Sequence, residues 1–236
     1  MVTPDADRYL AESSTADRFV VAKTPAMVDQ IAAKITELNA DRIFELGIFK
    51  GGSAALMASL ARPRRLSAVD IAEEPVAALE EFIATHGLEE VVRPHYGIDQ
   101  GLPEQLEALF EEDHGNEELD LVVDDGSHLY PETRTSFEVL FPRLRAGGLY
   151  VIEDWGWAHF PAPMWQSGGG WFHDRPALTN LVVELLMIAA TGADLISHIE
   201  VLRDTVSVTR GPLRLSASIR LRDHYYNRQL PFRPLL

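Results

Sequence analysis

The sequence contains no cysteine among its 236 residues, which excludes disulfide bonds and thiolate ligands to a metal. Positive charge is also scarce. The 21 lysine and arginine residues stand against 36 aspartate and glutamate residues, giving a formal net charge of −15. No cluster of basic residues offsets this imbalance, so we do not expect binding to the phosphates of a nucleic acid.

Long apolar runs are missing as well. The longest, LVVELLMIAA at residues 181–190, is too short to cross a bilayer and contains Glu184. The first residues, MVTPDADRYLAESS, lack the basic and then apolar layout of a signal peptide. We therefore expect a soluble, cytoplasmic protein with no membrane partner.

Apolar residues make up 46% of the chain, and their spacing alternates between the periods of strands and helices. Short apolar stretches predict strands at residues 42–47, 65–70, 90–97, 119–125 and 147–154. Helical spacing lies before and between them, at residues 25–38, 53–61, 74–87, 102–112 and 131–144. This alternation predicts an α/β fold: a Rossmann-like, doubly wound, mostly parallel sheet with helices on both faces.

The pattern changes after Asp154. Residues 155–175 are rich in glycine, proline and aromatic residues and predict a loop, which a helix at 176–191 follows. Two further stretches, 196–204 and 205–211, predict a hairpin at the sheet edge. We expect an irregular arm at 1–24 and a single domain at 25–236; the pattern assigns no element to the tail 212–236.

A first candidate site follows the first predicted strand. The stretch ELGIFKGGS brings together Glu45, Gly47, Gly51, Gly52 and Ser53, and glycines there let the backbone approach a ligand closely. Its spacing differs from the G-x-G-x-x-G of dinucleotide folds and from the phosphate loop of nucleotide triphosphatases.

Strand-end residues complete this candidate site. Asp70 ends the second strand, where a carboxylate can accept hydrogen bonds from both ribose hydroxyls, and Asp99 and Gln100 follow the third, toward the adenine end. These residues predict a nucleoside pocket. The alternative is a glycine turn at a helix start with a solvated aspartate.

A second candidate site follows the fourth and fifth strands, which end in DDGSH (124–128) and IED (152–154). Neighbouring parallel strands bring their ends together, so Asp125, Glu153 and Asp154 can converge. Clustered carboxylates raise one another's pKa unless a cation joins them, and a hard ion such as Mg²⁺ suits oxygen ligands. Taken singly, each acid can instead be a solvated charge at a helix start.

His128 lies three residues after Asp125, just before a predicted helix. An imidazole titrates near neutral pH and can take the proton of a metal-bound hydroxyl, which makes His128 the candidate catalytic base. The alternative is a packing or capping role. Asp124 is expected to support the site without binding the ion.

All the tryptophans of the chain lie in the 155–175 loop: Trp155, Trp157, Trp165 and Trp171. Aromatic faces suit the apolar side of a sugar ring or a polyketide, and such a loop can close over a substrate and exclude water. We therefore expect a substrate lid. The alternative is burial against the protein's own core or a partner subunit.

Together, ELGIFKGGS, Asp70, LVVDDGSH and GGLYVIED resemble the class I S-adenosylmethionine-dependent methyltransferases, over about residues 40–155. More narrowly, they resemble the metal-dependent sugar O-methyltransferases of macrolide pathways, of the macrocin and mycinamicin type. The resemblance implies S-adenosylmethionine as donor, with Asp125 also beside it. It also implies Mg²⁺ on Asp125, Glu153 and Asp154, and His128 as base. Catechol-type enzymes usually carry asparagine where Asp154 stands.

From these features we expect Mg²⁺-dependent transfer of a methyl group to a hydroxyl of a sugar on a natural product, as in antibiotic biosynthesis. The partner would be a small-molecule acceptor, and we expect a homo-oligomer. Three alternatives remain open: a catechol or phenol O-methyltransferase that uses the same metal site, an auxiliary role in a redox system, and a non-catalytic S-adenosylmethionine-binding protein.

Overall fold

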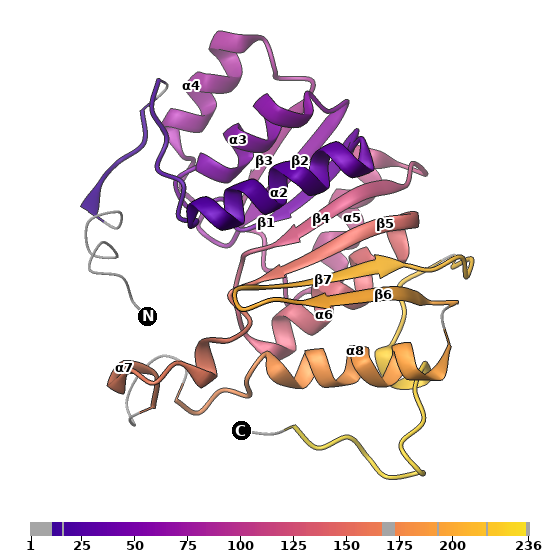
Figure 1. Ribbon diagram of the computed structural model, residues 1–236. Helices are drawn as coiled ribbons and strands as arrows, with labels where there is room; N and C mark the ends of the chain where they lie inside the picture. The colour runs from indigo at the N-terminus through magenta and orange to yellow at the C-terminus, as the bar shows by residue number, and fades with distance from the viewer. Residues whose placement is uncertain (1–10, 16, 167–172, 193, 216, 235–236) are drawn as a thin grey trace.

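A central sheet organises the computed structural model, which describes residues 11–15, 17–166, 173–192, 194–215 and 217–234. Within these residues, seven strands follow the order β3-β2-β1-β4-β5-β7-β6 (Figure 1). The strands are β1 (Arg42–Leu46), β2 (Arg65–Asp70), β3 (Val92–Tyr96), β4 (Leu119–Asp124), β5 (Leu144–Glu153), β6 (Ile196–Val201) and β7 (Thr205–Arg210). The first five run parallel, and β7 pairs antiparallel with both β5 and β6. This confirms the predicted fold class and its edge hairpin.

Helices connect the parallel strands and lie on both faces of the sheet (Figure 1). The longer ones are α2 (Pro25–Leu38), α3 (Gly52–Ala61), α4 (Ala77–His86), α5 (Pro103–His114), α6 (Tyr130–Leu140) and α8 (Thr179–Thr191). Shorter turns are η1 (Phe141–Arg143), η2 (Trp157–His159), α7 (Pro163–Gln166) and η3 (Leu221–Asp223). Among the described residues, no helix has the length and apolarity needed to cross a membrane.

Alternating residues of the strands build two separate cores. Ile43 and Val123 face α2, α3 and α4, whereas Phe44 and Val122 face α5, α6 and α8. All four side chains are fully buried, as expected for strands that are covered on both faces.

The boundaries differ from the expected ones where proline intervenes. The predicted helix 131–144 is shorter, because α6 ends at Leu140 and Pro142 lies in the turn η1. As a result β5 begins at Leu144, three residues before its predicted start at 147.

Parallel register brings the carboxyl ends of the central strands to one edge of the sheet. Leu46 pairs with Asp124, and Asp124 pairs with Ile152, so the residues that follow β1, β4 and β5 emerge side by side. The loops after these strands therefore meet, as ligand-binding loops do in doubly wound sheets.

Candidate active site

The loop after β1 lies against the loop after β4. Gly47 has φ +98°, and a Cβ atom there would lie 2.2 Å from the carbonyl oxygen of Asp125. Only glycine allows so close a contact at this backbone conformation. Gly52, at the start of α3, is similarly close to the backbone of the N-terminal segment, where a Cβ would lie 2.1 Å from the carbonyl oxygen of Val20.

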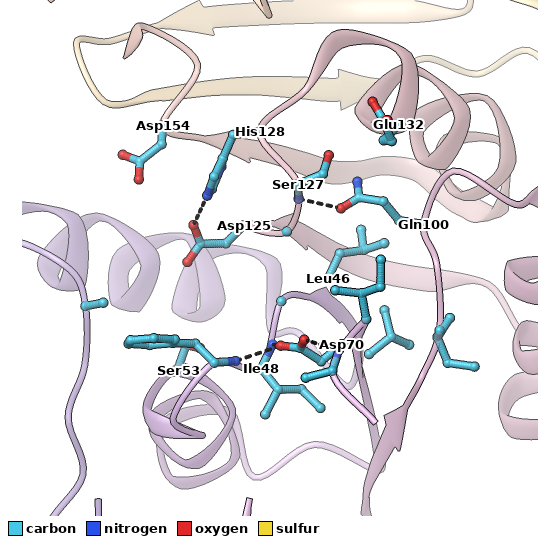
Figure 2. Close-up of a pocket in the computed structure, with 18 of the residues that line it drawn as sticks. Leu46, Ile48, Ser53, Asp70, Gln100, Asp125, Ser127, His128, Glu132 and Asp154 are labelled. Atoms are coloured by element: carbon cyan, nitrogen blue, oxygen red, sulfur yellow. Dashed lines mark hydrogen bonds and ion pairs between the residues drawn. The ribbon is translucent and has the colours of Figure 1, made fainter. Parts of the chain in front are cut away.

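Asp70 fixes the same loop from the end of β2. Its Oδ2 accepts hydrogen bonds from the backbone amides of Ile48 and Phe49, both at 2.9 Å, and its Oδ1 accepts one from Ala72 at 2.9 Å. A carboxylate offers about four acceptor positions, so one remains for a further donor. The side chain also lines a pocket (Figure 2).

The pocket has a volume of about 780 Å³ and lies at the carboxyl ends of the strands. That volume is within the usual range for a small-molecule or cofactor site. Most of the residues predicted for a nucleoside pocket line it: Gly47, Gly52, Ser53, Asp70, Asp99, Gln100 and Asp125.

Glu45 and Gly51 do not line the pocket. Glu45 is fully buried within β1, and burial raises its pKa to about 7, although nearby Ser53 and the charge of Lys23 act in the opposite direction. Glu45 therefore lies beneath the glycine loop. Its contact with the cofactor stays a prediction.

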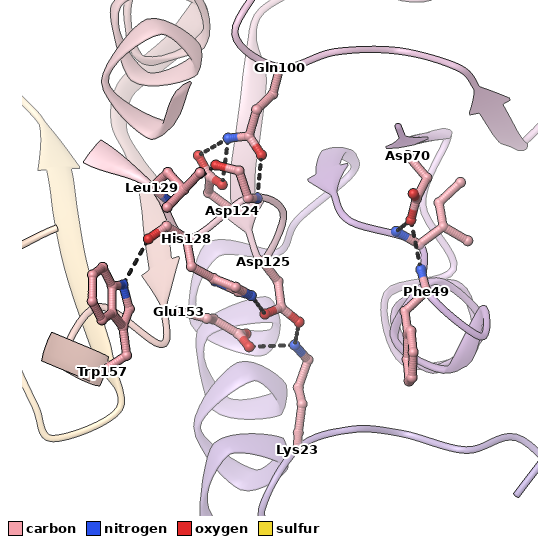
Figure 3. A network of polar contacts seen from close by, with 12 residues as sticks. Lys23, Phe49, Asp70, Gln100, Asp124, Asp125, His128, Leu129, Glu153 and Trp157 are labelled. Atoms are coloured by element: carbon pink, nitrogen blue, oxygen red, sulfur yellow. Dashed lines mark hydrogen bonds and ion pairs between the residues drawn. The ribbon is translucent and has the colours of Figure 1, made fainter. Parts of the chain in front are cut away.

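The side chain of Gln100 is hydrogen-bonded to residues of the protein that support the site. Its side-chain amide donates to Oδ1 of Asp124 at 3.1 Å and to Oγ of Ser136 at 3.1 Å, and its carbonyl accepts from the backbone amide of Ser127 at 2.7 Å (Figure 3). Asp124 also accepts from the hydroxyl of Tyr150 at 2.7 Å. This buried network positions the DDGSH loop, which is the supporting role expected for Asp124.

Asp125, His128 and Asp154 converge beside the pocket (Figure 2). Each offers one ligand atom, and these atoms all lie within 4.8 Å of one another. Nε2 of His128 is 4.0 Å from Oδ1 of Asp125. The structure thus brings together residues of the β4 and β5 loops as the sequence predicts.

Glu153 faces a different partner. Nζ of Lys23 donates to Oε2 of Glu153 and, at 2.7 Å, to Oδ2 of Asp125 (Figure 3). Burial, with Asp125 second, raises the pKa of Glu153 to about 8. For Lys23 burial acts to lower the pKa, but the two carboxylates outweigh it and hold the pKa above its usual value.

The donor set fits a magnesium ion. Ligand atoms at roughly 2.1 Å from Mg²⁺ lie up to roughly 4.2 Å apart, so the 4.8 Å spread of the atoms from Asp125, His128 and Asp154 needs only small side-chain movements. Hard ions prefer carboxylate to imidazole, which would leave His128 free for another role.

His128 is held through its main chain. Its φ is +55°, an uncommon value for a residue other than glycine, and its carbonyl oxygen accepts a hydrogen bond from Nε1 of Trp157 at 2.8 Å (Figure 3). Trp157 is only 4% exposed. It therefore supports the DDGSH loop, and its predicted place on a substrate lid stays a prediction.

Trp155 and Trp165 also lie outside the pocket lining. Nε1 of Trp155 donates to the carbonyl oxygen of Leu202 at 2.9 Å, and the ring of Trp165 lies 6.3 Å from that of Trp157. Trp171 lies outside the described residues. A lid function for Trp155, Trp165 and Trp171 stays a prediction.

Sequence reasoning missed two groups of residues that line the pocket. Val20, Ala22 and Lys23 come from the segment predicted to be an irregular arm, and Glu132 comes from the first turn of α6. No periodicity marks Lys23, which lies 102 residues from Asp125 in the chain. Glu132 follows Pro131 at a helix start, where acidic residues are common without any ligand.

Comparison with known proteins agrees with the fold. Residues 44–155 match the family model described as a methyltransferase domain. The fold is that of the class I methyltransferases: a putative caffeoyl-CoA O-methyltransferase from Staphylococcus aureus is similar over 88% of this chain and 92% of its own, with a TM-score of 0.60 at 17% identity. Residues 44–155 are thus similar to a methyltransferase domain, and the fold is shared with this class.

More particular relatives are sugar O-methyltransferases. Demethylmacrocin O-methyltransferase of Streptomyces fradiae is 60% identical over 43 residues, which are 18% of this chain and 11% of the relative. L-olivosyl-oleandolide 3-O-methyltransferase of Streptomyces antibioticus is 47% identical over 66 residues, 28% of this chain and 16% of the relative. The chain therefore resembles the macrocin and mycinamicin type, but the aligned part spans only a small fraction of these curated relatives.

A solved structure extends this similarity to most of the chain. The MycE methyltransferase of the mycinamycin pathway, determined with Mg, S-adenosylhomocysteine and mycinamycin VI, is similar over 87% of this chain and 53% of its own. The TM-score is 0.57 and the identity 26%. This chain spans about half the length of that protein.

Proposed function

We propose that this protein is a Mg²⁺-dependent O-methyltransferase that transfers the methyl group of S-adenosylmethionine to a sugar hydroxyl of a glycosylated natural product. The observation that carries the proposal is the convergence of Asp125, His128 and Asp154 beside a pocket that Gly47 and Asp70 also line. A protein that only binds S-adenosylmethionine needs neither the acids nor the histidine.

The pocket residues would hold the donor. Gly47 and Gly52 let the pocket wall pack against the backbone of Asp125 and Val20, and Asp70 retains an acceptor position for a ribose hydroxyl. Asp99, which follows β3 and lines the same pocket, is the candidate contact at the adenine end. These interactions would fix the sulfonium methyl in line with an acceptor, and orientation of this kind supplies much of the catalysis in such reactions.

The carboxylates of Asp125 and Asp154 would hold the ion, with Glu153 as the third predicted ligand. When bound, Mg²⁺ supplies a positive charge that orients the acceptor hydroxyl and lowers its pKa. His128 would accept the hydroxyl proton at its imidazole as the oxygen forms a bond to the methyl carbon. The carbon–sulfur bond breaks in the same step, and S-adenosylhomocysteine leaves with the electron pair.

The acceptor class rests on the relatives. Demethylmacrocin and L-olivosyl-oleandolide are the acceptors named for two of them, and MycE was determined with mycinamycin VI. The asparagine that catechol-type enzymes usually carry is replaced here by Asp154, which favours the sugar enzymes. A homo-oligomeric state and a cytoplasmic location stay predictions.

A methyl-transfer assay tests the proposal. The purified protein, S-adenosylmethionine and Mg²⁺ should methylate a glycosylated macrolide that carries free sugar hydroxyls, and EDTA should abolish the reaction until Mg²⁺ is restored. Asp154→Ala and His128→Ala should lower turnover by about a hundredfold or more, while calorimetry still detects S-adenosylhomocysteine.

Each part of the proposal can fail separately in this assay. Full activity in EDTA would refute the metal requirement. Methylation of a catechol but of no glycoside would favour the phenol enzymes instead. Unchanged turnover of His128→Ala would leave the metal site as the sole activator of the hydroxyl.

A further inference from the structure

Lys23 occupies a position between two of the carboxylates assigned to the metal site. Its Nζ contacts Oδ2 of Asp125 at 2.7 Å and also Oε2 of Glu153 (Figure 3). The side chains of Lys23 and Glu153 are each only 3% exposed. An ammonium at this position satisfies the same oxygens that a cation shared by Asp125 and Glu153 would need.

The two oxygens of Asp125 face different groups. Oδ2 faces Lys23, whereas Oδ1 faces His128 at 4.0 Å. The group of convergent ligand atoms accordingly contains Asp125, His128 and Asp154 but not Glu153, which is paired with Lys23. With Lys23 in place, the chain offers a divalent ion one carboxylate fewer than the sequence predicts.

We propose that Lys23 is an internal cation that competes with the divalent ion for Asp125 and Glu153, so that binding of the ion moves the ammonium away from these carboxylates. The inference rests on the metal site of the proposed function. Two positive charges cannot both lie at contact distance from the same carboxylate oxygens without strong repulsion. Lysine suits such exchange because its charge is compact and its four-carbon stem is flexible, unlike the planar fork of arginine.

Displacement of Lys23 would also change the pocket. Lys23 lies three residues after Val20, whose carbonyl oxygen lies against Gly52, and both residues line the pocket together with Ala22. Movement of Lys23 therefore changes one wall of the proposed donor site. By linkage, the ion and the donor should alter each other's affinity through this segment.

Calorimetric titration of metal-stripped protein with Mg²⁺ tests the competition. Lys23→Met removes the ammonium and retains an apolar stem of similar length, so it should bind Mg²⁺ about tenfold more tightly than the unaltered protein. Without the ion its melting temperature should fall, because Asp125 and Glu153 then face each other without a cation, and Mg²⁺ should raise it by more than in the unaltered protein.

Lys34→Met is the matched control. Lys34 pairs with Glu200 at 2.9 Å, away from the pocket, so its loss removes the same charge without touching the metal site. Its affinity for Mg²⁺ should equal that of the unaltered protein. If Lys23→Met does not fold, Lys23→Gln supplies a neutral side chain that can still donate to both carboxylates, and it should bind Mg²⁺ more tightly than the unaltered protein as well.

Equal or weaker binding of Mg²⁺ by the folded Lys23 variant would overturn the proposal, because a lysine that supports the ion predicts a loss of affinity. If neither the unaltered protein nor the variants bind Mg²⁺, the metal requirement of the proposed function fails too. Binding by the unaltered protein with no gain in the variant refutes only the competition.

Discussion

Asp70 has two tasks at the end of β2. Its carboxylate holds the amides of Ile48 and Phe49, which shape the glycine loop, and the same group faces the pocket where a ribose would bind. The sequence predicts only the second task, because the hydrogen bonds to the loop depend on the loop's folded course. One carboxylate therefore connects the shape of the site with recognition of its ligand.

Replacing this group should weaken donor binding. Asp70→Asn keeps the size of the side chain but removes its charge and one acceptor, so affinity for S-adenosylhomocysteine should fall by about 1–3 kcal/mol in calorimetry. Glu74→Gln is the control, since Glu74 is an exposed residue in the loop after β2 that does not line the pocket. Unchanged affinity of the Asp70 variant would place the donor elsewhere.

Between elements, Trp157 connects the segment after β5 with the DDGSH loop. Its indole nitrogen donates to the carbonyl oxygen of His128, which has a left-handed backbone conformation. Such a conformation costs of order 1–3 kcal/mol and persists only when its surroundings hold it. Trp157 is thus a positioning residue for the proposed base, although it does not line the pocket.

Loss of this single hydrogen bond should affect turnover more than binding. Trp157→Phe keeps an aromatic ring but removes the donor, so turnover should fall about tenfold as His128 loses its fixed position. Affinity for S-adenosylhomocysteine should change little. Trp155→Phe removes an equivalent bond, to Leu202 at 2.9 Å, and should retain turnover. Equal loss in both variants would indicate a general packing effect instead.

These elements show what the sequence could predict and where it stopped. Alternating apolar stretches and strand-end acids sufficed for the sheet, the glycine loop and the convergence of Asp125 with Asp154, since these follow from local periodicity and parallel register. The tryptophans illustrate the limit. Clustered aromatic residues predict a contact surface, yet composition alone does not distinguish a surface facing a substrate from one facing the protein's own core.

Contacts between distant segments could not be predicted from the sequence for a related reason. The ion pair of Lys23 with Glu153 joins residues 130 positions apart, and Lys23 lies in a polar stretch without periodicity. The same holds for Glu45, whose complete burial within β1 is decided by the helices that cover the sheet. Such features are set by tertiary packing.

In the whole molecule, ionisable groups are also buried far from the pocket. His114, at the end of α5, is 5% exposed, stacks on Phe110 with ring centroids 5.3 Å apart, and shares a hydrogen bond of 3.0 Å with Ser67. Burial lowers its pKa from 6.5 to about 4, and the charge of neighbouring Asp113 only partly offsets this. The fold thus holds this imidazole neutral where an unfolded chain would protonate it.

Stability should therefore depend on pH through His114. In the unfolded chain His114 binds a proton below its pKa of 6.5, whereas in the folded protein it binds one only below about pH 4. Acidification between these two pH values therefore favours unfolding. Between about pH 7 and about pH 5 this group alone should remove about 2 kcal/mol of unfolding free energy.

Glu45 and Glu153 act in the opposite direction, because their pKa values are raised to about 7 and about 8 and the folded protein binds their protons first. The test therefore compares the change in unfolding free energy between the two pH values in the variant and in the unaltered protein. Urea unfolding at the two pH values should show that His114→Gln lacks the destabilising contribution that the unaltered protein carries. His86→Gln, at an exposed position at the end of α4, should behave like the unaltered protein. If the two variants have the same pH dependence of stability, the pKa of His114 does not differ between the folded and the unfolded state.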